Sequence, residues 1–176
     1  MCAQMSKKKG TPQSKPLQER IPQVPAAPTL RFTPTAWAKL LYFRDRGPTE
    51  IGGFGIAEPE DLLRVVDFVT VRQEVGVASV RFDDTAVAEF FEDQVDMGRQ
   101  PNQFARLWLH THPGNCADPS GTDEATFHRV FGSCDWAVMA ILARNDRMTA
   151  TLRFNVGPGG QMALHAAGSL PGKGVA

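Results

Sequence analysis

The chain has 176 residues, and its 19 acidic residues balance its 19 basic residues. This balance gives no overall field that favours nucleic acid or an anionic membrane, and no apolar run approaches the ~20 residues that cross a bilayer. We therefore expect a globular protein with no nucleic-acid partner and no membrane partner. We also expect a cytoplasmic location, because Lys7, Lys8 and Lys9 are not followed by the apolar stretch of a secretory signal.

Residues 1–29 differ in composition from the rest of the chain, being rich in Pro, Gln and Lys. Such a segment cannot bury enough apolar surface to offset its ordering entropy, so we expect a disordered tail with polyproline II character. Its three consecutive lysines are either a docking element or part of a solvated tail. Residues 30–166 suit one domain of common size, and residues 167–176, rich in Gly and Ala, are expected to be flexible.

The domain begins with a predicted helix over residues 36–46, capped by Thr35 and ended by Gly47 and Pro48. Residues 50–57 follow as a predicted strand that contains three glycines. Glycines weaken a strand unless something must come close to its backbone. This strand is therefore either a glycine-rich bend or a place of close approach.

Two further strands and a helix complete the first half of the domain. The predicted segments are a strand over residues 62–71, a loop over 74–78, a strand over 79–82 and a helix over 85–97. Asp83 or Asp84 caps this helix. The side chains expected to face inward are Val87, Phe90, Phe91 and Val95.

The second half alternates apolar runs with turns. Residues 104–109 predict a buried strand, and a short helix starts near Thr122 and ends at Gly132. Residues 136–142 predict a central strand, and residues 148–156 and 162–166 predict a hairpin. The sum is an α/β fold with a mixed, mostly antiparallel sheet between helices.

Two histidines stand at the end of the strand over residues 104–109. At the strand period of two, His110 and His112 point to the same face. Asp123 lies in the first turn of the following helix, whose N-terminus returns toward the strand end. Two imidazoles and one carboxylate are ligands that Zn²⁺ accepts, and they leave a fourth position open, as in a catalytic site. Each residue alone fits a structural role, since Ser120 to Asp123 is also a good helix N-cap.

These residues resemble the signature of the JAMM metalloproteases, also called MPN or JAB. The signature is an early glutamate, then His-x-His-Pro, then Ser-x-x-Asp after seven residues. Glu50, the run His110-Thr111-His112-Pro113 and the run Ser120-Gly121-Thr122-Asp123 occupy every position of it. The resemblance covers about residues 30–165. It implies a curved sheet flanked by helices, as in the cytidine-deaminase-like fold, and one Zn²⁺ per chain held by His110, His112 and Asp123.

The resemblance also implies roles for Glu50 and Ser120. Glu50 would take a proton from the zinc-bound water and pass it to the leaving amine. The Ser120 hydroxyl would donate to the oxyanion, a role compatible with helix capping. In this interpretation, the water and an extended substrate approach the glycine-rich strand.

The implied activity is that of a zinc-dependent metalloprotease or isopeptidase. The implied substrate is the peptide or isopeptide bond at the C-terminal tail of a ubiquitin-like or sulfur-carrier-like protein. The compact chain is similar to stand-alone bacterial members that accompany ubiquitin-like conjugation systems, so a partner from such a system is a further expectation. Because the segment after residue 71 is short, we expect it to cover little of the cleft.

Two alternatives come from other functional classes. One is a DNA-repair-associated protein like RadC, which shares the His-x-His and Ser-x-x-Asp spacing. The absence of a helix-hairpin-helix pattern and of a basic stripe outside the tail argues against it. The other is a non-catalytic MPN scaffold, but scaffolds of this family typically lack ligands that are all present here.

The three cysteines, Cys2, Cys116 and Cys134, have no metal-binding spacing and do not suggest a disulfide framework. Cys116 lies between the histidines and Asp123, so its thiolate could occupy the open zinc position. The alternative is a bystander thiol. Two nearby acids, Asp118 and Glu124, are expected to face solvent or to support the ligands.

Overall fold

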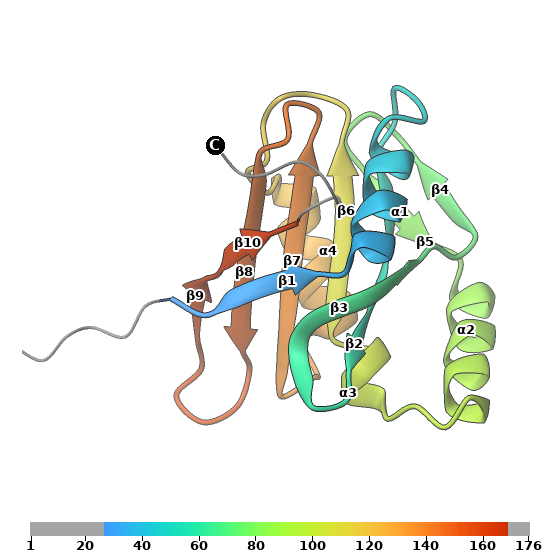
Figure 1. The fold of residues 1–176 in the computed structure, drawn as a ribbon, viewed down its shortest axis with the longest axis vertical. Coiled ribbons are helices and arrows are strands. Elements are labelled where there is room, and N and C mark those ends of the chain that lie inside the picture. Colours follow the sequence, from blue (N-terminus) through green and yellow to red (C-terminus); the bar gives the residue numbers. More distant parts are fainter. Residues whose placement is uncertain (1–26, 169–176) are drawn as a thin grey trace, which may run out of the picture.

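The computed structural model describes residues 27–168 of the chain. This range contains ten strands and four helices (Figure 1). The strands are β1 (Thr29–Phe32), β2 (Ile51–Glu58), β3 (Asp61–Val69), β4 (Gln73–Val75), β5 (Val80–Phe82), β6 (Leu107–His112), β7 (Trp136–Ala143), β8 (Met148–Phe154), β9 (Gly160–Ala163) and β10 (His165–Ala167). The helices are α1 (Pro34–Arg44), α2 (Asp84–Asp96), α3 (Pro101–Phe104) and α4 (Gly121–Phe131). Within this range, every helix is too short or too polar to cross a membrane.

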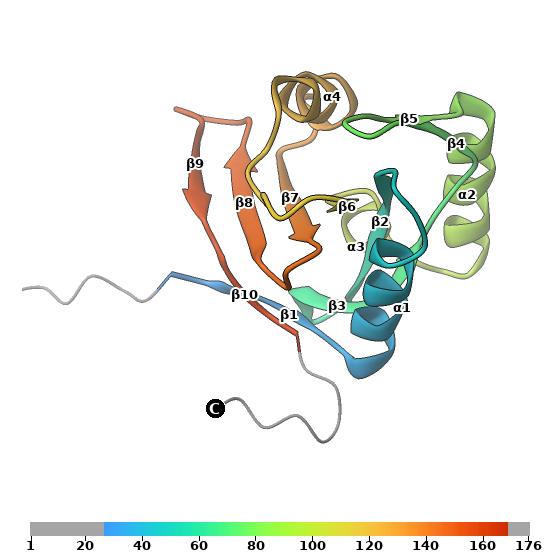
Figure 2. The ribbon, with the colours of Figure 1, turned by 90° about the horizontal axis from the view of Figure 1, so that it is seen from above.

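Eight of the strands form one strongly curved sheet, which comes close to closing on itself when seen from above (Figure 2). Its order is β10-β1-β3-β2-β6-β7-β8-β9, and β4 and β5 form a separate hairpin. The pairs β1–β10, β1–β3 and β6–β7 are parallel, and the other pairs are antiparallel. The prediction of an α/β fold with a mixed, mostly antiparallel sheet is confirmed.

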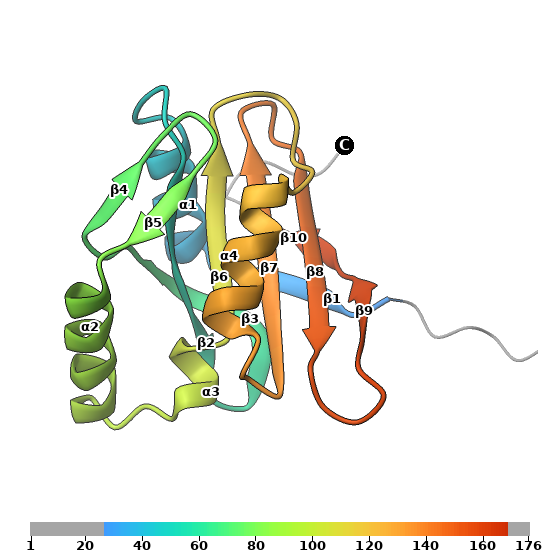
Figure 3. The ribbon, with the colours of Figure 1, turned by 180° about the vertical axis from the view of Figure 1, so that it is seen from behind.

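Two clusters of buried apolar side chains lie on the two faces of the sheet. Helix α1 packs through Ala36 and Leu40 into the cluster that the curved sheet surrounds. Helices α2 and α4 and the β4–β5 hairpin cover the opposite face (Figure 3). That second cluster is aromatic, and it contains Phe54, Phe82, Phe90, Phe104, Trp108, Phe127 and Phe131. Burying an aromatic side chain contributes roughly 1.5–3 kcal/mol, so this cluster firmly attaches α4 to the sheet.

Helix α1 begins two residues earlier than predicted. Thr33 is its N-cap, and the Thr33 side chain accepts a hydrogen bond from the backbone N–H of Ala36. The predicted cap at Thr35 is wrong, because Pro34 occupies the first helical position, where its fixed φ suits the helix. The helix ends at Arg44 with Asp45 as C-cap, before Gly47.

Of the strands at the two ends of the described range, β1 was not predicted, and β10 overlaps only the end of the strand predicted over residues 162–166. They pair in parallel, with Thr29 opposite His165 and Arg31 opposite Ala167. Each is three or four residues long, and only tertiary pairing defines it. The described strands therefore extend beyond the predicted domain of residues 30–166 at both ends. Most of the predicted tail, including its lysines and Cys2, and residues 169–176 lie outside the described residues.

Two predictions on either side of α3 are wrong in detail. Val95 of α2 is 56% exposed, while Gln94 is buried, because the buried stripe runs through Ala86, Phe90 and Gln94 at a spacing of four. Phe104 closes the short helix α3, and the following strand starts only at Leu107 and includes both histidines.

Candidate metal centre

Strand β6 carries the two histidines into the middle of the sheet. It pairs with β2 on one side and β7 on the other, and all six of its residues are buried. His110 is 0% exposed and His112 is 9% exposed. Because side chains alternate along a strand, both imidazoles point toward the face that α4 covers.

Asp123 reaches the same place from the first turn of α4. Ser120 is the N-cap of this helix: its hydroxyl oxygen accepts from the backbone N–H of Asp123 at 3.1 Å. The carboxylate of Asp123 accepts in return from the backbone N–H of Ser120 at 2.7 Å, which completes a capping box. This arrangement turns the buried carboxylate back toward the end of β6.

Glu50 lies one residue before β2, not within the strand as predicted. Ile51 pairs with Thr111, so the antiparallel register places Glu50 beside His112. Its backbone N–H donates to the carbonyl of Gly76, in the turn of the β4–β5 hairpin, at 2.9 Å. The Glu50 side chain is only 2% exposed.

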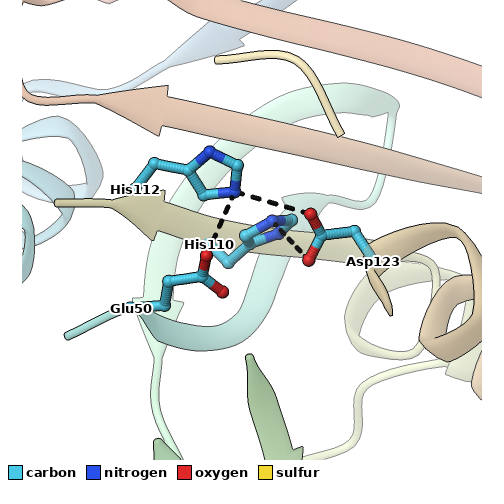
Figure 4. Close-up of side chains that lie close together, drawn as sticks. All are labelled: Glu50, His110, His112 and Asp123. Carbon is cyan, nitrogen blue, oxygen red and sulfur yellow. Dashed lines mark ion pairs between the residues drawn. The ribbon is translucent and has the colours of Figure 1, made fainter. Parts of the chain in front are cut away.

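The four side chains meet in one buried group (Figure 4). Each offers one potential ligand atom, and these atoms all lie within 4.8 Å of one another. His110 Nε2 lies 3.3 Å from Asp123 Oδ1, and His112 Nε2 lies 3.5 Å from both Asp123 Oδ2 and Glu50 Oε1. The structure thus brings together Glu50, His110, His112 and Asp123 from three separate parts of the sequence.

Several buried polar atoms of this group lack hydrogen-bond partners among the described residues. Glu50 Oε2, both ring nitrogens of His110 and His112 Nε2 are buried and make no hydrogen bond. An unsatisfied buried polar atom typically costs about 1–3 kcal/mol, and one shared partner could satisfy Glu50 Oε2, His110 Nε2 and His112 Nε2 together. His112 Nδ1 contacts the Cys116 carbonyl at 2.8 Å, which fixes the tautomer with Nε2 free to act as a ligand. The donor set therefore fits a divalent cation that accepts nitrogen and oxygen ligands.

The surroundings set the charge of each group. Burial raises the pKa of Glu50 to about 7 and lowers the pKa of His110. Burial alone would raise the pKa of Asp123, but its contacts with His110 and His112 outweigh this and hold the pKa below its ordinary range. Burial also opposes protonation of His112, yet the contacts with Asp123 and the Cys116 carbonyl raise its pKa. At neutral pH, Asp123 is thus ionised, and Glu50 is close to its own midpoint.

Ser120 contacts Asp123 through a second hydrogen bond. Its hydroxyl donates to Asp123 Oδ2 at 2.7 Å. A hydroxyl has one proton, and here that proton is directed at the carboxylate. The geometry supports the capping role of Ser120 and gives no support to its predicted role as an oxyanion donor.

The Cys116 thiol lies outside the buried group. The side chain is exposed, and its Sγ atom donates to Asp118 Oδ2 at 3.5 Å. Only the backbone carbonyl of Cys116 approaches a candidate ligand. The bystander alternative fits this arrangement, and the proposed occupation of the open zinc position does not. Glu124 pairs with Arg153 at 2.6 Å on the far side of α4.

The glycines of β2 leave space for neighbouring side chains and backbone of the same chain. A Cβ atom on Gly52 would lie 2.8 Å from Val80, and one on Gly53 would overlap the carbonyl of Val69. The Gln73 side chain bonds both the N–H and the C=O of Gly52, at 2.9 and 2.8 Å, while β6 pairs with its other edge. The predicted approach of a substrate beside this strand is wrong, because both edges are occupied at Gly52.

Among the described strands, an edge open to an extended chain lies instead on β5 of the β4–β5 hairpin. Only the β5 half of this hairpin was predicted. Residues 79–82 were predicted as a strand, but Gln73–Val75, with only three residues, carry no clear pattern. Val80 and Phe82 are buried in the aromatic cluster, so the hairpin covers this face of the sheet more than expected. A groove of about 560 Å³ separates it from α4. Its lining includes Gly76, whose carbonyl accepts from the Glu50 backbone N–H, and Thr122, which precedes Asp123 in the sequence.

Comparison with protein-family models and with curated proteins gives no match to this chain.

Proposed function

We propose that this chain is a zinc-dependent peptidase or isopeptidase of the JAMM type. His110, His112 and Asp123 would hold the metal, and Glu50 would transfer the proton. The observation that carries the proposal is the buried group of four side chains, whose ligand atoms face one another; among the described residues, Glu50 Oε2, His110 Nε2 and His112 Nε2 have no hydrogen-bond partner. The spacing of these residues in the sequence is the second support.

The ligand set suits hydrolysis. Two neutral imidazoles and an ionised carboxylate are three protein ligands, the number found in catalytic zinc sites that keep one position open. Zinc bound there would supply Lewis-acid activation of water and of the scissile carbonyl. The Asp123 carboxylate also accepts two hydrogen bonds from Ser120, which orient it toward the imidazoles.

Glu50 is suited to accept a proton and to release it. Its Oε2 atom has no hydrogen-bond partner among the described residues, and burial raises the pKa of Glu50 to about 7. A general base works best when its pKa is close to the operating pH, and such a group typically contributes about 10²–10⁴-fold in rate. Glu50 would take the proton of the attacking water and deliver it to the leaving amine.

The groove between β5 and α4 supports an extended substrate. Among the described strands, β5 pairs only with β4, so its other edge is free to bind an extended chain by backbone hydrogen bonds. The groove is lined by charged and polar side chains, including Glu74, Arg81 and Arg129. An extended C-terminal tail in this groove would run past Gly76, whose carbonyl accepts from the Glu50 backbone N–H, and past Thr122, next to Asp123. Such a tail is the part of a ubiquitin-like or sulfur-carrier-like protein that we propose as the substrate.

The proposal is tested with the full chain and a panel of ubiquitin-like and sulfur-carrier-like proteins, each fused at its C-terminus to a reporter. We expect cleavage at the end of the tail, loss of cleavage after chelation, and recovery when zinc is restored. Cleavage that survives complete removal of metal would contradict the proposal. So would a zinc-loaded protein that cleaves no member of the panel.

A further inference from the structure

The His110 ring is held in an unusual way. His112 is fixed by a hydrogen bond from Nδ1 to the Cys116 carbonyl. His110 has no such bond among the described residues, since neither ring nitrogen has a hydrogen-bond partner. A metal-binding histidine ordinarily donates its second N–H to a carbonyl or carboxylate, which fixes the orientation of the ring. Another contact must therefore fix the orientation of the His110 ring.

Trp108 stacks against the His110 ring. It lies two residues earlier on β6, on the same face of the strand, and is 1% exposed. The two ring centroids are 4.4 Å apart, with an angle of 25° between the planes. This geometry restricts rotation of the imidazole about its χ2 angle, which is otherwise a soft torsion.

The indole is itself closely packed. It stacks on Phe127 and Phe131 of α4, with centroids 6.1 and 6.4 Å away. Gly52 also leaves space for it, because a Cβ atom there would lie 3.3 Å from Trp108 Nε1. Helix α4 also carries Asp123. The aromatic stack therefore couples the orientation of His110 to the helix that supplies Asp123.

We infer that Trp108 is a positioning residue for the metal site, and that its stacking replaces the missing hydrogen bond to His110. The inference rests on the metal-binding part of the proposed function and not on peptide cleavage. Removing the aromatic ring would leave His110 free to rotate away from the other donors. The loss of the ring would lower metal affinity more than it lowers the stability of the fold.

The test compares Trp108→Leu, which keeps apolar bulk, with Trp108→Phe, which keeps an aromatic face. Phe104→Leu is the matched control, because Phe104 is equally buried in the same cluster and is not a neighbour of His110 in it. Zinc affinity is measured by competition with a chelator, and the unfolding temperature of the metal-free protein is measured in parallel. We expect Trp108→Leu to lose about 10- to 100-fold in affinity, the range known for residues that orient ligands. Phe104→Leu should lose little affinity, although both variants should melt at a lower temperature.

A spectroscopic signature separates positioning from general destabilisation. The visible absorption of bound Co²⁺ reports the geometry of its ligands, so it should change in Trp108→Leu and stay as in the wild type in Phe104→Leu. Trp108→Phe should restore most of the affinity and the wild-type spectrum. Equal zinc affinity in wild type and Trp108→Leu, with an unchanged Co²⁺ spectrum, would overturn the inference. A protein that binds zinc tightly and cleaves no substrate would contradict only the proposed function.

Discussion

The carboxylate of Asp123 accepts two hydrogen bonds from Ser120, one from the backbone N–H and one from the hydroxyl, each 2.7 Å long. The same pair forms the N-cap of α4. Stability of the helix and orientation of a candidate metal ligand therefore depend on one hydroxyl group.

Replacing Ser120 with Ala should lower both stability and metal affinity. Loss of an N-cap side chain typically costs about 1 kcal/mol. Loss of the second hydrogen bond to Asp123 should weaken zinc binding by roughly tenfold or more. Denaturant unfolding of the metal-free protein and chelator competition measure the two effects separately.

The control for this prediction is Thr33→Ala, which removes the N-cap of α1. Thr33 contacts Val66 and Ala36 and none of the four clustered residues. Its loss should lower stability by a similar amount and leave zinc affinity unchanged. If both variants lower zinc affinity equally, the effect of Ser120 belongs to folding and not to the metal site.

Removing one ligand should abolish the stabilisation that zinc provides. Zinc at a thousand times its Kd stabilises a folded protein by about 4 kcal/mol, which raises the unfolding temperature. We expect this rise in the wild type and in His128→Ala, since His128 is exposed on α4. It should be absent in His112→Ala. A full thermal shift in His112→Ala, measured by calorimetry, would remove His112 from the ligand set.

The burial of Glu50 predicts a pH dependence for the metal-free protein. Its pKa rises from the ordinary 4.5 to about 7 because the carboxyl group is desolvated. The folded state therefore binds more protons than the unfolded chain between these values, and stability from this group is complete below pH 4.5 and lost as the pH rises through 7. Glu50→Gln has no such loss. It should match the wild type at pH 4.5 and exceed it at pH 8 by an amount on the order of 3 kcal/mol. Parallel pH profiles of the two unfolding free energies would contradict this.

The close packing of β2 predicts different outcomes for two glycine substitutions. A Cβ atom on Gly53 would overlap the Val69 carbonyl and lie 2.7 Å from the Phe68 ring, whereas Gly47 has no neighbour within 4 Å. Gly53→Ala should therefore destabilise the protein by about 1–3 kcal/mol or more, as other overpacked cores do. Gly47→Ala should be close to neutral. Urea unfolding of both variants measures the difference, and similar values would mean that β2 is less tightly packed than described.

Part of the candidate metal cluster was predictable, because local rules place His110, His112 and Asp123. Glu50 reaches the cluster through the pairing of β2 with β6. A period of two puts His110 and His112 on one face, and the Ser120 to Asp123 capping box turns the carboxylate back toward them. The α/β fold class was predictable from the order of strand and helix patterns along the chain. These features depend on residues close together in the chain, which a single sequence contains.

The missed features depend on contacts between distant segments. Strand β1 is defined by pairing with β10 and β3, and β4 is defined by pairing with β5. The interpretation of the β2 glycines failed for the same reason: the sequence does not show that Val80 and Val69 pack against them. Likewise, the packing of Trp108 against Phe127 and Phe131 of α4 joins segments that are distant in the sequence.

In the proposed mechanism, Glu50 moves a proton beside a metal held by three other residues. Glu50→Gln keeps the size of the side chain and removes its basicity, and Glu60→Gln at an exposed position is the matched control. Zinc content and the rate of cleavage of the best fusion substrate are measured on the same samples. We expect one zinc per chain in all three proteins, with cleavage about 10²–10⁴-fold slower in Glu50→Gln alone. Wild-type cleavage by zinc-loaded Glu50→Gln would contradict the account.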